Sequence, residues 1–231
     1  MTDFDKNGFE ILNDVLSLER CDVLAIELSA MHQRRTESTK NKPGGVRNLL
    51  QLSQQVKDVA NSYELKSILE KRLVKPAFPV RALFFDKTPE ANWRVAWHQD
   101  LTIAVAEQIE TQGFEAWSIK EGITHVQPPS RILEGMMAIR LHLDDCNANN
   151  GALKVIPGSH LEGKLNAGQI KSSSENRTIC TCEVSRCGAM LMRPLLLHAS
   201  STAQAPSHRR VLHIEYAVDE LPGRLNWFER Q

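Results

Sequence analysis

Hydrophobic residues in the first third of the chain recur every three to four positions, the period of a helix with one buried face. Ser17 is a suitable N-cap for the first such segment. The expected helices cover Cys21–Met31, Leu49–Val59 and Leu65–Leu73. A polar segment, Gln33–Gly45, follows the first helix and ends in Pro43-Gly44-Gly45, which predicts a loop.

After Pro79 the pattern changes to short hydrophobic runs, most of them rich in β-branched or aromatic residues, which predict strands. The runs are Val80–Phe85, Trp93–Trp97, Leu101–Ala106, Met136–Leu143, Ala152–Ile156, Thr178–Val184, Ala189–Met192, Leu195–Ala199 and Val211–Ala217. Turn residues separate them and no regular helices alternate with them, which indicates a mainly β protein, a sandwich or jelly roll. The long connections Glu107–Arg131 and Lys164–Arg177 are expected to be loops.

Length and composition are those of a globular protein with a sizeable core, with 42% hydrophobic and 24% charged residues among 231. We expect one domain over residues 1–231, with a helical buttress in 1–78 outside a jelly-roll core in 79–218. Lys plus Arg and Asp plus Glu both total 28, which argues against nucleic acid or an anionic membrane as partner. No apolar run is long enough to span a membrane and Met1–Glu10 does not resemble a leader, so we expect a cytoplasmic protein.

The five cysteines do not form the pattern of a disulfide framework, because their number is odd. Cys180-Thr181-Cys182 followed by Cys187 could suggest zinc, but no second Cys-x-x-Cys or nearby histidine pair completes a site. We therefore expect five reduced thiols without zinc, which thiol counting under denaturing, non-reducing conditions would test.

A His-x-Asp pair at His98-Gln99-Asp100 lies in an extended, apolar stretch. Side chains alternate across a strand, so His98 and Asp100 point to one face and can take adjacent positions on one metal ion. His142-Leu143-Asp144 has the same spacing, but the Asn149-Asn150-Gly151 turn follows closely. We interpret Asp144 as a turn residue and His142 as a core residue or a neighbour of the ligands.

A third ligand must come from a distant segment. His198 lies at the end of an apolar run, where an unpaired imidazole would be costly, and Arg209-Arg210 begins the last strong strand. Two histidines and one carboxylate form the facial triad that holds non-haem Fe(II) and leaves positions open for a chelating co-substrate and dioxygen. A guanidinium on the neighbouring strand would pair bidentately with a carboxylate of that co-substrate.

These residues carry a resemblance to a known family. The order of Trp97-His98-Gln99-Asp100, His142-Leu143-Asp144-Asp145, Asn150-Gly151-Ala152-Leu153, Ile156-Pro157-Gly158-Ser159-His160, His198 and Arg209 resembles the phytanoyl-CoA dioxygenase family. Members are Fe(II)- and 2-oxoglutarate-dependent oxygenases on a double-stranded β-helix. The resemblance covers about Val80 to Ala217, and Ala199 departs from it by replacing a frequent glycine.

The resemblance implies His98, Asp100 and His198 as iron ligands, and Arg209 with Ser200 as the partners of the distal 2-oxoglutarate carboxylate. Arg210 is the alternative to Arg209, because strand parity is not fixed by sequence. The implied reaction consumes dioxygen, converts 2-oxoglutarate to succinate and carbon dioxide, and hydroxylates a small molecule. The intact carboxylate at Asp100 argues against the halogenating relatives.

Three further residues are candidates for substrate contacts. Arg140 shares strand parity with His142 and could anchor an acidic group or form a structural salt bridge. Trp117 and His125 lie in the Glu107–Arg131 insert, which either contacts substrate or is a surface excursion. Trp97 is expected to pack behind its strand, because it does not share parity with His98.

Two other functions retain part of this pattern. A cupin-like metal enzyme, an isomerase or epimerase, would keep the His/Asp/His set but would not need Arg209. A non-catalytic ligand-binding jelly roll would tolerate loss of the triad, and the complete set argues against it. The substrate is not specified by the sequence.

Overall fold

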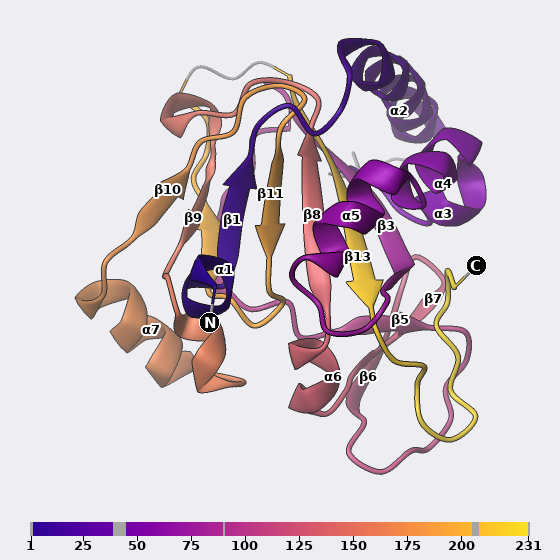
Figure 1. Ribbon diagram of the computed structural model, residues 1–231, viewed down its shortest axis with the longest axis vertical. Coiled ribbons are helices and arrows are strands. Elements are labelled where there is room, and N and C mark those ends of the chain that lie inside the picture. The colour runs from indigo at the N-terminus through magenta and orange to yellow at the C-terminus, as the bar shows by residue number, and fades with distance from the viewer. Residues whose placement is uncertain (1, 39–44, 90, 205–207, 231) are drawn as a thin grey trace.

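The computed structural model describes residues 2–38, 45–89, 91–204 and 208–230. Its largest sheet has six antiparallel strands in the order β1-β11-β8-β13-β3-β2 (Figure 1). The strands are β1 (Phe9–Leu12), β11 (Ala189–Met192), β8 (Met137–His142), β13 (Arg209–Ala217), β3 (Phe78–Lys87) and β2 (Gly45–Val46). We call it the major sheet.

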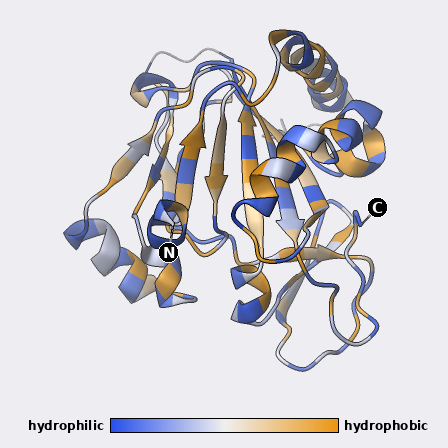
Figure 2. Cartoon of the chain, in the orientation of Figure 1, coloured by the Kyte–Doolittle hydropathy of each residue, from blue (hydrophilic) through white to orange (hydrophobic). Residues whose placement is uncertain are grey.

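Alternation along the central strands gives the major sheet two different faces. Met137, Ile139 and Leu141 of β8 belong to the core under the helices, whereas Arg140 lines the cavity on the opposite face. Both faces are covered, which explains why β8 is buried at every position and reads as a nearly continuous apolar run. Figure 2 shows hydrophobic residues concentrated on these central strands.

Four N-terminal helices cover the outer face of the major sheet (Figure 1). They are α2 (Leu18–Ser38), α3 (Leu49–Leu52), α4 (Gln54–Ala60) and α5 (Tyr63–Glu70). The helix expected after Ser17 is present, and the Ser17 hydroxyl accepts a hydrogen bond from the Arg20 amide.

The helix boundaries differ from the sequence expectation in three places. The loop expected at Gln33–Gly45 is wrong for residues 33–38, which continue α2; residues 39–44 lie outside the described residues. The helix expected over Leu49–Val59 is two helices, because Ser53 ends α3 and caps α4. The third helix ends at Glu70, before Leu73.

A second, minor sheet of four strands has the order β10-β9-β12-β4. It consists of β10 (Cys180–Cys182), β9 (Leu153–Val155), β12 (His198–Ser200) and β4 (Val95–His98). Leu153 and Val155 share a hydrophobic cluster with Ala138 and Met190 of the major sheet, so the two sheets face each other across a core. The strand expected at Leu195–Ala199 begins only at His198.

The long connections contain regular structure, contrary to expectation. A third sheet, β5-β7-β6, is formed by β5 (Ile103–Val105), β7 (Ile123–Gln127) and β6 (Glu115–Lys120), and α6 (Ser130–Glu134) follows it. The polar segment at 164–177 holds helix α7 (Ala167–Asn176).

The N-terminal region also differs from a purely helical buttress. Helix α1 (Asp3–Asn7) precedes β1, and β1 pairs with β11 at the edge of the major sheet.

Three-residue and four-residue 3-10 turns, at Ala148–Asn150 and Ser159–Glu162, flank β9. None of the helices in the described ranges combines the length and the apolar character that a membrane span requires.

Candidate metal and co-substrate site

Two histidines from neighbouring strands of the minor sheet face each other. In the pairing of β12 with β4, His198 lies directly opposite His98, and the two rings are 4.1 Å apart between centroids. Asp100 follows β4, and its backbone amide is held by the Pro194 carbonyl at 2.9 Å. Pairing of two strands and one loop therefore brings His198 together with residues that lie 98 and 100 positions before it in sequence.

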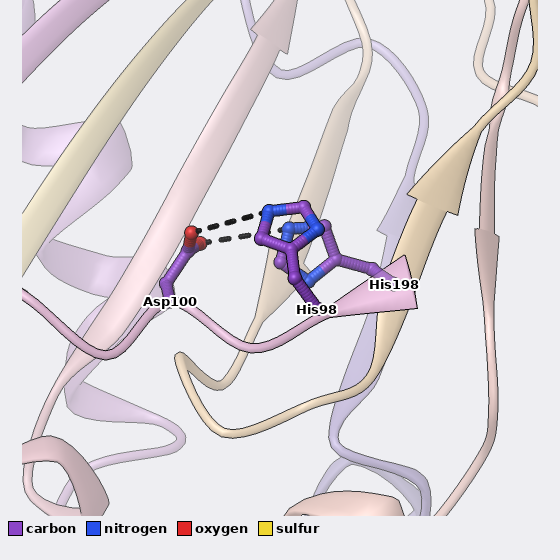
Figure 3. A group of neighbouring side chains, drawn as sticks. All are labelled: His98, Asp100 and His198. Carbon is purple, nitrogen blue, oxygen red and sulfur yellow. Dashed lines mark ion pairs between the residues drawn. The ribbon is translucent and has the colours of Figure 1, made fainter. Parts of the chain in front are cut away.

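The three side chains converge on one point (Figure 3). Asp100 Oδ1 is 3.8 Å from His98 Nε2, and Asp100 Oδ2 is 3.7 Å from His198 Nε2. One potential ligand atom from each residue lies within 4.8 Å of the other two. His198 is buried, whereas His98 and Asp100 are partly exposed, which leaves one side of the group open to the cavity.

Both imidazoles are oriented by backbone carbonyls. The Nδ1 atoms of His98 and His198 lie 2.9 Å from the carbonyl oxygens of Ala96 and Leu196. A carbonyl can only accept, so each Nδ1 carries the proton and each Nε2 presents its lone pair to Asp100. This is the arrangement in which a histidine binds a metal through Nε2.

Gln99 holds the turn from the opposite face. Its amide nitrogen donates to the carbonyls of Gly163 and Leu195 at 2.8 and 2.7 Å, and its carbonyl accepts from the Leu165 amide at 2.8 Å. The strand alternation expected for His98-Gln99-Asp100 is therefore present, and the middle residue fixes the loop that carries Asp100. Trp97 packs behind the strand against Ile156, Leu165 and Leu197, as expected.

The protonation states of His198 and Asp100 suit metal binding better than they suit an ion pair between the two side chains. Burial is the main cause that lowers the pKa of His198 to about 4, despite the nearby Asp100 carboxylate. Burial raises the pKa of Asp100, but His198, His213, His98 and Arg81 together hold it below its ordinary value. A neutral imidazole beside an ionised carboxylate is the protonation state that binds metal.

A cavity of about 500 Å³ opens above the triad, within the range of small-molecule sites. The charged side chains that line it, among the described residues, are Arg47, Arg81, Lys87, Lys120, Arg140, Arg209, Asp100 and Glu215. Six cations face two carboxylates, so the cavity has a strong positive potential.

Arg209 and Lys87 lie on adjacent strands of the major sheet, directly opposite in register. The Lys87 ammonium donates to Ser200 Oγ at 3.0 Å and to the Ser201 carbonyl at 2.8 Å, and thus joins the major sheet to the minor sheet. Burial, followed by the charge of Arg209, lowers the pKa of Lys87 to about 8. Arg209 donates to the Gly151 carbonyl at 2.8 Å, while its buried Nε has no partner among the described residues.

A second polar series continues along the same face of the major sheet. Arg140 Nη1 donates to His213 Nδ1 at 3.1 Å, and His213 Nε2 lies 3.4 Å from Glu215 Oε1. Arg81 Nη1 donates to the same Glu215 oxygen at 3.1 Å. Because an arginine cannot accept, His213 Nδ1 must be the acceptor and Nε2 carries the proton toward Glu215.

The sequence profile of the family described as "Phytanoyl-CoA dioxygenase (PhyH)" matches residues 4–211. The chain belongs to the phytanoyl-CoA dioxygenase family. Comparison with curated protein sequences gives no match.

Solved structures resemble the chain over nearly its whole length. AviO1 from Streptomyces viridochromogenes is 20% identical, with 95% of this chain and 94% of that chain covered and a TM-score of 0.69. EctD from S. alaskensis with bound Fe is 17% identical, with 98% and 80% covered and a TM-score of 0.73. SnoK, a non-heme alpha ketoglutarate dependent carbocyclase from nogalamycin biosynthesis, is 12% identical, with 94% and 82% covered and a TM-score of 0.72. These similarities confirm the predicted fold, a double-stranded β-helix with N-terminal helices packed outside.

In this member of the phytanoyl-CoA dioxygenase family, the second His-x-Asp pair is divided between two environments. His142 is buried, and neither ring nitrogen has a partner among the described residues, so burial lowers its pKa well below the usual value. Asp144 lies instead in a bidentate ion pair with Arg210, with Oδ1 2.6 Å from Nη2. The interpretation of Asp144 as a turn-capping residue is thus replaced by an arginine pair.

The three substrate candidates are placed differently. Arg140 lines the cavity and donates to His213, and it forms no salt bridge, the alternative role, with any of the described residues. Trp117 packs against a hydrophobic cluster beneath the third sheet, and His125 is buried with Nδ1 3.0 Å from the Ile123 carbonyl. Neither Trp117 nor His125 is among the residues that line the cavity, whereas Lys120 and Gln127 of the same hairpin are.

The cavity is also lined by charged or polar residues that were not selected by sequence, among them Lys87, Arg81, Glu215 and His213. His213 and Glu215 share strand parity with Arg209, which was a usable signal. Lys87 and Arg81 share parity too, but Lys87 lies beyond the end of the expected strand and the inward face of that strand could not be identified from its apolar residues.

The thiols are distributed over separate elements. Cys180 and Cys182 lie on β10 of the minor sheet, and Cys187 packs in the core beneath the helices beside Cys21. All five are free cysteines in the structure. Burial is the first cause that raises the pKa of Cys21, to about 11, so this thiol is poorly reactive near neutral pH.

Proposed function

We propose that the protein is an oxygenase that uses Fe(II) and 2-oxoglutarate to hydroxylate a small molecule. The observation that carries the proposal is the convergence of His98, Asp100 and His198 at the base of a cavity whose opposite wall presents Arg209. A facial set of two imidazoles and one carboxylate is characteristic of non-haem Fe(II) oxygenases. Structures of EctD are described with bound Fe and with 2-oxoglutarate and 5-hydroxyectoine.

The donor atoms of His98, Asp100 and His198 are of the types that bind iron. Two neutral nitrogens and one carboxylate oxygen leave coordination positions open, and each imidazole is held by a backbone carbonyl in the tautomer that exposes Nε2. When bound, iron and 2-oxoglutarate supply the oxidising chemistry with dioxygen, which no protein side chain can provide. The chain itself supplies the three metal-binding side chains, excludes bulk water, and positions 2-oxoglutarate and the substrate.

The wall formed by Arg209, Lys87 and Ser200 fits the distal carboxylate of 2-oxoglutarate. Arg209 is buried and keeps an unpartnered Nε, and this donor is free to bind an anion. Ser200 Oγ accepts from Lys87, so the hydroxyl hydrogen remains available to the same anion. A buried guanidinium with a free donor would be costly unless a ligand pairs with it. An isomerase or epimerase would have no use for Arg209 at this position, and this supports the oxygenase over that alternative.

An anaerobic titration with Fe(II) and 2-oxoglutarate tests the proposal. The expected result is a weak visible charge-transfer band that requires both components. A screen of small molecules for succinate release then identifies substrates, and isotopically labelled dioxygen shows whether one oxygen atom enters the product, as hydroxylation requires. SnoK is described as a carbocyclase, so product analysis must distinguish hydroxylation from ring formation. If metal and 2-oxoglutarate both fail to bind, the proposal is wrong.

A further inference from the structure

Five of the six cations of the cavity form two groups at different places, and Arg140, which donates to His213, belongs to neither. Arg209 and Lys87 are paired across β13 and β3 at one end, and Glu215 and Arg81 are paired across the same two strands at the other. Six residues along a strand correspond to roughly 20 Å, which is much longer than a five-carbon diacid. A 2-oxoglutarate molecule held by Arg209 therefore cannot also occupy the Arg81 end.

The metal triad lies between these two ends. His213 is placed between Arg209 and Glu215 on β13, and it lines the same cavity as Asp100 and Arg81. Asp100, His213 and Glu215 also line a small shared hollow. A co-substrate that reaches from the metal to Arg209 leaves the Arg81 side of the metal open.

Three cations gather on that open side. Arg81 comes from β3, Arg47 follows β2, and Lys120 ends β6 of the third sheet. All three side chains line the same cavity. Burial lowers the pKa of Lys120, and the positive charges of Arg81 and Arg47 lower it further. The same three cations contribute to the low pKa of the neighbouring His125, after burial.

The available carboxylates do not neutralise this group. Glu215 pairs with one nitrogen of Arg81, and Glu121 pairs with Arg47, with Nε 3.3 Å from Oε1. Among the described residues, the Lys120 ammonium has no hydrogen-bond or ion-pair partner. A divalent metal and a dianionic co-substrate add equal and opposite charge, so they leave the positive surplus unchanged.

From this surplus we infer that the substrate carries an oxyanion, a carboxylate or a phosphate monoester, which Arg81 and Lys120 bind with Arg47 at the rim. The inference rests on the proposed function, because it assigns Arg209 to 2-oxoglutarate. A guanidinium that has only one nitrogen engaged by Glu215 retains donors for an oxyanion. Lys120 adds a positive charge on a flexible, exposed side chain, which can reach acids of different lengths.

Calorimetry on the full chain, loaded with Mn(II) and saturated with 2-oxoglutarate, tests this inference. Saturation occupies the Arg209 end, so an added anion reports on the Arg81 end. Propionate and methyl phosphate are the probes for the two acid types, and propionamide is the neutral control. We expect one of the two anions or both to bind in the millimolar range, and propionamide not to bind.

Charge variants at position 120 identify the site. Lys120 is exposed, so its replacement leaves no buried group unpaired. Lys120→Ala should weaken anion binding about three- to tenfold and Lys120→Glu by more than about tenfold, because a reversed charge repels the anion. The matched control is Lys171→Glu on α7, an exposed lysine remote from the cavity, which should have no effect. Arg81→Lys should keep the charge but bind more weakly than the native protein.

The outcomes separate the two proposals. If metal and 2-oxoglutarate bind with native affinity but no anion binds, or if Lys120→Glu binds it as well as the native chain, the inference is wrong and the proposed function stands. If Lys120→Glu weakens 2-oxoglutarate as strongly as it weakens the probe, the cations serve the co-substrate, and the inference is again wrong. If metal and 2-oxoglutarate themselves do not bind, the proposed function fails first.

Discussion

Adjacent residues can have opposite roles, as Arg209 and Arg210 show. Arg209 is buried and faces the cavity, whereas Arg210 points to the helical side and forms an ion pair with Asp144. Arg210 also donates to Ser29 of α2 at 3.2 Å. Sequence left open which of the two faces the site, and strand alternation decides it once the inward face is known.

Replacing Arg209 is expected to weaken 2-oxoglutarate binding. Removing one member of a buried, charge-assisted pair costs about 2–5 kcal/mol, so Arg209→Ala should reduce affinity by about one to three decades. Metal binding should be retained, because Arg209 is not among the three converging ligands. Arg209→Lys should recover part of the loss, since it keeps the charge without the planar fork. Calorimetry with 2-oxoglutarate measures all three.

Arg210→Ala is the matched control. It should leave 2-oxoglutarate affinity unchanged and lower the free energy of unfolding by about 1–2 kcal/mol, because the half-buried Asp144 loses its partner. Urea unfolding measures this loss. Loss of 2-oxoglutarate affinity in Arg210→Ala, with none in Arg209→Ala, would contradict the assignment of the two arginines.

The two His-x-Asp pairs give a second prediction. Asp100→Ala should abolish tight binding of a divalent metal, as should His98→Ala or His198→Ala, because two ligands from a preformed triad hold a metal weakly. Asp144→Ala should bind metal normally, since Asp144 pairs with Arg210 instead. Mass spectrometry measures the metal content of each variant after dialysis. Loss of metal from Asp144→Ala alone would falsify the choice of pair.

At the scale of secondary structure elements, the β6–β7 hairpin and helix α7 are among those that the sequence did not predict, because their signals are weak. The β6–β7 hairpin turns at Glu121-Gly122, where both residues have positive φ, 54° and 78°. Such turns normally have Asn or Asp before the glycine, so a glutamate gave little indication of a hairpin. Helix α7 carries three serines, which are poor helix formers, although its Asn166 and Gln169 form a capping box that the sequence does contain.

The helical layer is attached to the major sheet by particular hydrogen bonds. The Tyr216 hydroxyl of β13 donates to the Ala60 carbonyl at the end of α4 over 3.0 Å in a buried environment. Tyr216→Phe should lower the free energy of unfolding by about 1–2 kcal/mol, because a buried carbonyl loses its partner. Tyr63→Phe, which removes an exposed hydroxyl, should leave it unchanged. Chemical denaturation compares the two, and equal stability of both variants would contradict this attachment.

At the scale of the whole molecule, the architecture was predictable and the pairing of strands was not. Short strands without intervening helices indicated a jelly roll, and the resemblance to the family implied His98, Asp100 and His198, which the structure brings together. The sequence does not show that β1 joins β11 or that Lys87 lies opposite Arg209, because those pairings join segments far apart in the chain. The cations of the Arg81 end come from three segments far apart in the chain, so they become a group only in the folded protein.

The C-terminal segment connects two layers through one buried acid. The Glu229 carboxylate accepts from the amides of Leu50 in α3 and Ala82 in β3, at 2.8 and 3.0 Å. Burial raises its pKa to about 7, although these hydrogen bonds and Arg81 oppose the rise and Glu215 assists it. The folded protein therefore holds a proton that the unfolded chain, with an ordinary pKa near 4.5, releases.

This acid should make stability depend on pH. Between about pH 4.5 and 7 the folded state binds more protons than the unfolded state, so the contribution of Glu229 to the free energy of unfolding falls as pH rises, by about 3 kcal/mol in total. Urea unfolding of the native chain and of Glu229→Gln at pH 5 and pH 8 measures it. The variant should show a smaller decrease, whatever its absolute stability, and Glu175→Gln on exposed α7 should behave as the native chain does.

The site is built from the two facing sheets, and each sheet can change in evolution without the other. The converging ligands belong to the minor sheet and its loop, whereas Arg209 and Arg81 belong to the major sheet. A single substitution of a metal ligand can therefore abolish metal binding while the arginines of the major sheet stay in place. A protein changed in this way would bind acids without oxidising them, as a carrier or sensor does. Changes in the β6–β7 hairpin reach the cavity through Lys120 and Gln127, so the acids that it accepts can change while the residues of the major and minor sheets are preserved.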